Sequence, residues 1–152
     1  MNKTLKNLCR GALATALLAL LASPVLAHVT KVVGDGAYSV VLGYLDAPLY
    51  VGEVETAEIN ISDADGNPVE GLAESLVAEI LGPDGATLTL TVRSVHGTPG
   101  IYLADFVPTV VGNYDVRVRG FIGEYEFDEV FSGVEMVHAD PVVGDPATIS
   151  VP

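Results

Sequence analysis

Histidine is the residue type in this chain best suited to bind a ligand. His28 directly follows Val25-Leu26-Ala27, a sequence of small and apolar residues typical of a signal-peptidase site. Cleavage after Ala27 would make His28 the first residue, so that its α-amine and its ring Nδ1 could hold one ion in a single chelate ring. Copper(II) has the highest affinity of the common divalent metals for such nitrogen ligands. The sequence therefore predicts copper(II) binding at His28. The alternative is that His28 is an exposed polar residue without a metal.

Three other side chains are candidates for completing such a site: His96, Met136 and His138. Met136 and His138 are two residues apart, so they share a face if that segment is extended, and a thioether with an imidazole suits copper(I). His96 lies in the segment Ser94–Pro99, which we expect to be a loop, and a carboxylate is a further alternative. A terminal amine titrates at about 7.7–8.0 and an imidazole at about 6.5, so a metal can displace both protons near neutral pH.

Motifs for catalysis are absent. The sequence has no Gly-x-Ser-x-Gly elbow, no His-Glu-x-x-His helix, no phosphate-binding loop and no cysteine nucleophile after Ala27, so we predict that the chain is not an enzyme. The segment Asp63–Asn67 resembles the opening of a calcium-binding loop. Glycine stands at its fourth position and Pro68 at the sixth, where the EF-hand loop requires glycine, which favours a hairpin turn instead.

The first 27 residues are predicted to form a cleavable signal helix. Lys3, Lys6 and Arg10 make a positive start, and the apolar stretch Gly11–Ala22 follows. That stretch is shorter than the roughly 20 residues of a membrane span. We therefore expect an exported protein, periplasmic or extracellular, that has no contact with a membrane after cleavage.

Composition bounds the remaining chain and its partners. His28 to Pro152 is 125 residues, the length of one domain, and Cys9 would leave with the signal, so no disulfide is expected. Four basic residues remain against twenty acidic ones, a formal charge of −16. So negative a surface repels nucleic acid and anionic lipid. A metal ion or a protein remains as the expected partner.

Short runs of alternating apolar and polar residues, separated by Gly, Pro, Asp and Asn, predict strands throughout the mature chain. No helical period is sustained. We expect an all-β fold, an immunoglobulin-like antiparallel β-sandwich of about seven to eight strands over residues 28–133, followed by an extension over 134–152 that covers an edge or stays mobile. The expected strands are Val29–Val33, Tyr38–Leu45, Glu55–Ser62, Leu76–Leu81, Thr87–Arg93, Ile101–Val107, Tyr114–Phe121 and Tyr125–Phe131.

Charge pairing predicts the register of the last hairpin. A turn at Ile122-Gly123 would set Arg119 opposite Glu126 and Arg117 opposite Asp128, with apolar residues on the other face. Each such pair contributes only about 0.2–1 kcal/mol. Their agreement favours a structural role for both arginines over an anion site.

Several motifs resemble those of known families. Gly112-Asn113-Tyr114 resembles the tyrosine corner of Greek-key sandwiches. The segments Pro99–Thr109 and Gly112–Val118 resemble a strand pattern of many extracellular immunoglobulin-like modules, and the turn Asp65–Val69 resembles that of the YtkA-like group of small secreted bacterial β-sandwiches. This resemblance covers roughly residues 50–131 and implies the fold more than the function.

The chain also resembles CopC-type periplasmic copper-binding proteins, through His28 and the fold class. In those proteins the mature N-terminal histidine is a ligand, so the resemblance implies copper at His28. This chain lacks their methionine-rich segment. We therefore predict an exported, non-catalytic binding module, and copper(II) is the most specific ligand that the sequence suggests. The alternative is a structural or protein-interaction domain, envelope- or adhesin-like, that pairs exposed strand edges with another chain.

Overall fold

The alternation of apolar and polar residues forms two stacked β-sheets in the computed structural model, which describes residues 28–139. The predicted signal segment, 1–27, and residues 140–152 lie outside the described residues. The larger sheet has the order β1-β2-β4-β8-β7. Its strands are β1 (His28–Val33), β2 (Tyr38–Tyr44), β4 (Glu55–Asp63), β8 (Ile101–Phe106) and β7 (Val92–Ser94).

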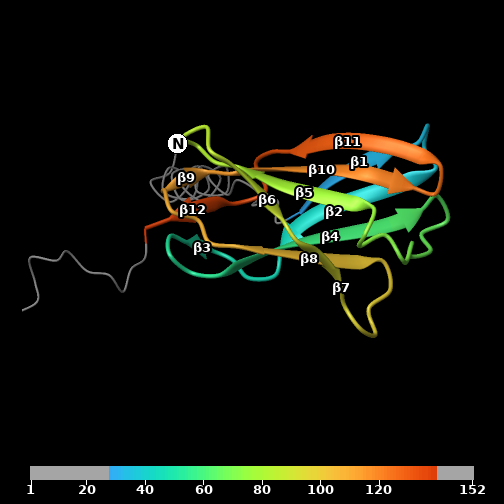
Figure 1. The fold of residues 1–152 in the computed structure, drawn as a ribbon, viewed down its shortest axis with the longest axis horizontal. Coiled ribbons are helices and arrows are strands. Elements are labelled where there is room, and N and C mark those ends of the chain that lie inside the picture. Colours follow the sequence, from blue (N-terminus) through green and yellow to red (C-terminus); the bar gives the residue numbers. More distant parts are fainter. Residues whose placement is uncertain (1–27, 140–152) are drawn as a thin grey trace, which may run out of the picture.

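The second sheet has the order β11-β10-β5-β6 and faces the first (Figure 1). A small third sheet, β3-β12-β9, lies at one end of the sandwich. The bounds of these strands are β5 (Leu76–Leu81), β6 (Thr87–Leu90), β10 (Asp115–Ile122), β11 (Tyr125–Phe131), β3 (Leu49–Tyr50), β9 (Gly112–Asn113) and β12 (Met136–His138).

The core lies between the two larger sheets because alternate side chains of each strand point inward. Ile59 and Ile61 of β4 and Val116 and Val118 of β10 are all 0% exposed. The polar residues between them face outward. The all-β, immunoglobulin-like sandwich is therefore confirmed. Among residues 28–139, no helix is long and apolar enough to cross a membrane.

The segment Thr87–Arg93 differs from the single strand that the sequence predicts. Thr87–Leu90 pairs with β5 in the second sheet, whereas Val92–Ser94 pairs with β8 in the first. The chain crosses between the sheets at Thr91. Leu90 is buried in the core, and an Arg93 guanidinium nitrogen lies 3.1 Å from Asp105 of β8, so each half is held by its own sheet.

The predicted register of the last hairpin was wrong by two residues. Ile122 pairs with Tyr125, so the turn is at Gly123-Glu124, and Gly123 has the positive φ of +63° that this turn needs. A shift of two residues leaves every side chain on its expected face. Arg117 Nε still donates to Asp128 Oδ1 at 2.6 Å, but from a diagonal position. This hydrogen bond lowers the pKa of the Asp128 carboxyl.

The predicted tyrosine corner is confirmed. The Tyr114 hydroxyl donates to the carbonyl oxygen of Val110 at 2.9 Å and accepts from its N–H at 3.1 Å. Tyr114 is 5% exposed. This contact ties the connection between the two sheets to the start of β10.

The sandwich continues beyond residue 133, where the sequence suggested that it would end. Val134 and Val137 are 2% and 0% exposed, and Val137 pairs with Leu49 of β3 and Gly112 of β9. The first six residues of the expected extension thus belong to the described fold. Strands of two or three residues show no measurable alternation, which is why the sequence did not reveal them.

The small third sheet should contribute to stability through Leu49, which is 0% exposed. We expect Leu49→Ala to lower the free energy of unfolding by about 2–5 kcal/mol, because it leaves a cavity under β12. Leu45→Ala is the matched control. Leu45 is 50% exposed, and its loss should change stability by less than about 0.5 kcal/mol. Urea denaturation followed by circular dichroism measures both, and equal effects would contradict a core role for this sheet.

Candidate functional site

His96 lies at an open cleft formed by the loop between β7 and β8. The loop folds locally, because Thr98 donates from its N–H and its hydroxyl to Val95 O at 3.3 and 3.2 Å. It is anchored to the sheet where Ile61 N–H donates to Gly100 O at 2.9 Å. An added Cβ at Gly100 would lie 2.7 Å from Pro68, so only glycine fits this approach.

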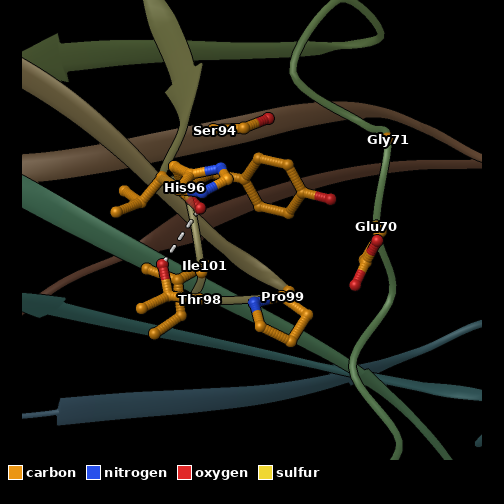
Figure 2. A pocket seen from close by; sticks show the side chains of 11 residues that line it. Glu70, Gly71, Ser94, His96, Thr98, Pro99 and Ile101 are labelled. Atoms are coloured by element: carbon orange, nitrogen blue, oxygen red, sulfur yellow. Dashed lines mark hydrogen bonds between the residues drawn. The ribbon is translucent and has the colours of Figure 1, made fainter.

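The cleft has a volume of about 490 Å³. Figure 2 shows Glu70 and Gly71 on one side, and Ser94, His96 and Thr98 on the other. The cleft thus offers a carboxylate, an imidazole and hydroxyls to a polar ligand. The Tyr102 hydroxyl beneath it is already used, because it donates to Val69 O at 2.6 Å and accepts from Leu72 N–H at 3.2 Å. Burial raises the pKa of Tyr102, and its hydroxyl has a structural role.

The structure separates His96 from His28. His28 begins β1, at one edge of the larger sheet, whereas His96 follows β7, at the opposite edge. Four strand spacings of about 4.8 Å place the two edges roughly 19 Å apart. One ion cannot bind both histidines in this fold.

Met136 and His138 share the outward face of β12, as their spacing predicts. Val137 between them points into the core, and Met136 is 41% exposed. His138 Nε2 lies 3.9 Å from Glu135 Oε1, and the His138 ring centroid lies 6.2 Å from that of Tyr50. The imidazole therefore has a carboxylate neighbour at the surface.

Three carboxylates, Glu55, Asp115 and Glu135, act electrostatically on the Tyr44 hydroxyl at the same end of the sandwich, and we call them the acidic cluster. Burial raises the pKa of Tyr44 well above its usual range, and Asp115, Glu55 and Glu135 raise it further. Among the described residues, this hydroxyl has no hydrogen-bond partner. Glu55 is itself buried and accepts from Tyr50 N–H at 2.8 Å.

His28 pairs with Gly43, so the His28 side chain lies on the outer face of the larger sheet, whereas Tyr44, the next residue of β2, points to the inner face. Within residues 28–139, no three His, Cys, Asp or Glu side chains are close enough to hold a metal ion. Sequence reasoning missed the cluster. One signal was available: Glu55 occupies an inward position of β4, two residues before Ala57, where a carboxylate is out of place.

A second surface feature is the β6 edge, the outer backbone of Thr87–Leu90. In the described strand order, β6 ends its sheet. Gly82 N–H donates to Ala86 O at 2.8 Å, so these two residues form a hydrogen-bonded pair. Every second pair along an antiparallel ladder is hydrogen-bonded, so Leu88 and Leu90 also direct their backbone groups to β5. By the alternation of antiparallel pairs, Thr87 and Thr89 direct theirs away from the sheet.

An apolar groove of about 150 Å³ adjoins this edge. Leu88, which is 53% exposed, and Val107, which is 46% exposed, contribute to its walls, together with Phe106 and Tyr114. The complete lining consists of Ile80, Gly82, Asp84, Ala86, Thr87, Leu88, Phe106, Val107, Thr109 and Tyr114.

Comparisons with known proteins show remote structural likeness only. No model of a known protein family matches the chain, and no curated protein sequence is similar to it. A DUF4785 family protein from Legionella pneumophila aligns with a TM-score of 0.47 and 9% identity, over 68% of this chain and 29% of that chain. The Lin-41 filamin domain aligns with a TM-score of 0.45 and 14% identity, over 64% of this chain and 91% of that chain.

This chain therefore spans less than a third of the length of the Legionella protein. The assignment of the fold rests on the strand order and core of the chain itself. The resemblance to YtkA-like and CopC-type proteins finds no support in these comparisons and stays a prediction.

Two tyrosine substitutions should have opposite effects on stability. Tyr44→Phe removes a buried hydroxyl that has no partner among the described residues, and we expect it to raise the free energy of unfolding by about 1–3 kcal/mol. Tyr114→Phe leaves both backbone groups of Val110 without their partner, and should lower it by about 1–3 kcal/mol. Urea denaturation measures both. A destabilised Tyr44→Phe variant would show that the hydroxyl has a partner in solution.

Proposed function

We propose that this chain is an exported, non-catalytic interaction module that binds a partner protein by adding an extended segment of that partner to the β6 edge. Export is inferred from the predicted signal segment. The observation that supports the binding mode is that β6 is uncharged, whereas the other outer strands of the two larger sheets carry charged side chains. Natural sheets commonly use charge to prevent pairing at an exposed edge.

Charged side chains protect the outer strands β1 and β11 from pairing with a further strand, and some of these side chains meet across the sandwich. Lys31 Nζ of β1 lies 2.7 Å from Glu129 Oε2 of β11 and 5.7 Å from the Phe131 ring centroid. The strand β11 also carries Glu126 and Asp128. A further strand would meet these charges at either edge.

The remaining two edges differ from each other. The strand β7 has three residues, and Arg93 within it bonds to Asp105. In contrast, Ala86–Val92 contains no charged residue in a chain whose mature part has a formal charge of −16. Among the outer strands of the two larger sheets, β6 is thus the one without a charge that opposes pairing.

The groove beside β6 supplies side-chain selectivity. Strand addition takes its affinity from main-chain hydrogen bonds and its specificity from pockets for alternate side chains. Here Thr87 and Thr89 offer the main-chain groups, and the groove at Leu88 and Val107 accepts apolar side chains. The partner segment is therefore extended and uncharged, with apolar residues at alternate positions.

Edge pairing can be tested with a fluorescent seven-residue peptide of alternating threonine and valine, carrying one terminal lysine for solubility. Thr89→Pro removes an outward N–H and should weaken binding about tenfold, whereas proline at an edge position keeps the β5 pairing. Thr89→Lys should weaken binding similarly. The matched control is Thr30→Lys, at an exposed position of β1.

Fluorescence polarisation gives the affinity, and urea denaturation verifies that each variant is folded. Binding that Thr89→Pro leaves unchanged, or that Thr30→Lys weakens equally, contradicts pairing at the β6 edge. No binding at all would remove this proposed function.

Copper(II) at His28 is a second candidate function. It is favoured by the exposure of His28 at the first position of β1, where cleavage after Ala27 would leave its amine free beside its ring. Its amine and ring would chelate the ion once Ala27 is removed, and Glu135 or His138 would supply a further ligand. Met136 shares the face of His138, whereas His96 is excluded by its distance.

Mass spectrometry of the secreted protein should give His28 as the N-terminal residue, and copper(II) titration should give an electron paramagnetic signal of nitrogen ligation. His28→Ala should weaken binding at least about tenfold. His138→Ala should alter the signal, and His96→Ala is the matched control that should leave it unchanged. A different N-terminus, or equal losses in His28→Ala and His96→Ala, would exclude this site.

A further inference from the structure

We propose that the partner of the β6 edge is a second copy of this chain, so that the β6 strands of two copies pair antiparallel about a twofold axis at Leu88. This inference rests on the proposed function of that edge. Three observations support it: the chemistry of β6 itself, the direction of its outer main-chain groups, and the apolar side chains that are exposed beside it.

The β6 strand has the chemistry that its own edge requires of a partner segment. It is extended and uncharged, and apolar leucines alternate with threonines along Thr87–Leu90. A second copy presents this segment already fixed as a strand, because β5 pairs with all of its residues. Binding a preformed strand avoids the entropy cost of ordering a flexible peptide. The β6 strand of another copy is therefore a suitable partner segment.

The main-chain groups of β6 are self-complementary under twofold symmetry. Leu88 directs its N–H and C=O to β5, whereas Thr87 and Thr89 direct theirs outward. If the axis passes beside Leu88, Thr87 of each copy lies opposite Thr89 of the other, and each such pair can exchange both of its main-chain hydrogen bonds. A twofold dimer requires a surface that complements itself in this way. The two Leu88 residues then face each other with Cα atoms about 4.5 Å apart.

The apolar side chains exposed beside the edge would be covered in this dimer. Leu88 lies opposite Ile80, which is 4% exposed, so the Leu88 side chain points to the inner face of its sheet. Leu88 is nevertheless 53% exposed, because β6 is an outer strand of the described sheet. Val107 lines the same groove. A twofold axis perpendicular to the sheet brings the inner faces of both copies to one side, so these side chains meet their counterparts and leave water.

Charge limits where two copies can meet. The mature chain has a formal charge of −16, and so large a net charge normally keeps copies of a protein apart. Ala86–Val92 contains no charged residue, and of the residues that line the groove only Asp84 is charged. The Asp84 carboxylate accepts from Ala86 N–H at 3.0 Å, within its own turn. The β6 edge therefore lets two copies approach with little direct repulsion, and salt should screen the repulsion that remains.

Analytical ultracentrifugation of the secreted protein over about a hundredfold range of concentration tests the dimer. We expect a monomer–dimer equilibrium whose dissociation constant falls when sodium chloride is raised from about 0.05 M to about 0.5 M. Thr89→Pro and Thr89→Lys should each raise the dissociation constant at least about tenfold. Thr30→Lys, at an exposed position of β1, adds the same charge as Thr89→Lys and should leave it nearly unchanged. Circular dichroism verifies that each variant is folded.

A disulfide tests the register of the pairing. Cys9 is the only cysteine of the sequence and lies in the predicted signal segment, so the secreted protein should have no thiol of its own. Leu88→Cys should give a covalent dimer with oxidised glutathione, because the expected Cα separation lies within the range of disulfides. Val32→Cys is the matched control. Val32 is 66% exposed on β1, and this variant should stay monomeric on a non-reducing gel.

The outcomes separate this inference from the function of the edge. A protein that is monomeric at every concentration, with no more covalent dimer from Leu88→Cys than from Val32→Cys, overturns the dimer. The edge itself still stands in that case if the alternating threonine-valine peptide binds in a Thr89-dependent manner. A dimer that Thr89→Pro leaves unchanged uses another surface and also overturns the inference. Absence of both the dimer and peptide binding overturns the proposed function as well.

Discussion

Burial of alternate apolar side chains between two facing sheets holds this molecule together. The central strands β4 and β10 present fully buried isoleucines and valines to each other, and Phe131 and Tyr102 are buried in the same core. The described residues contain no cysteine, so packing and the strand ladders stabilise the fold without disulfides. Because this packing requires every inward position to be apolar, polar chemistry is confined to the outer faces, the loops and the sheet edges.

The edges of the two larger sheets are joined in different ways on the two sides of the sandwich. On one side, Lys31 and Glu129 join β1 to β11 across the sandwich. On the other side, the chain itself crosses from β6 to β7 and connects the sheets covalently. That crossing moves the chain into the larger sheet after Leu90, so β6 remains an outer strand. An uncharged edge beside an apolar groove is the result.

Acidic residues gather at the end of the sandwich that holds the small third sheet. Glu55 tolerates burial there because Tyr50 N–H donates to its carboxylate. Burial raises the pKa of the Tyr44 hydroxyl, and the negative charges of Asp115, Glu55 and Glu135 raise it further. This end combines an unpartnered hydroxyl among the described residues, a surface histidine beside Glu135 and the first residue of β1.

Local patterns alone determined the all-β class, the bounds of strands such as Leu76–Leu81 and Tyr125–Phe131, the corner at Tyr114 and the turn after Asp63, because alternation and turn chemistry act between near neighbours. The hairpin register missed by two residues, since charge pairing can be satisfied diagonally. Only the tertiary structure decided that Thr87–Arg93 divides between two sheets, that Val137 is a core residue and that His28 and His96 lie at opposite edges. These facts depend on contacts between segments that lie far apart in the chain. The pattern within one segment does not show which other segment it packs against.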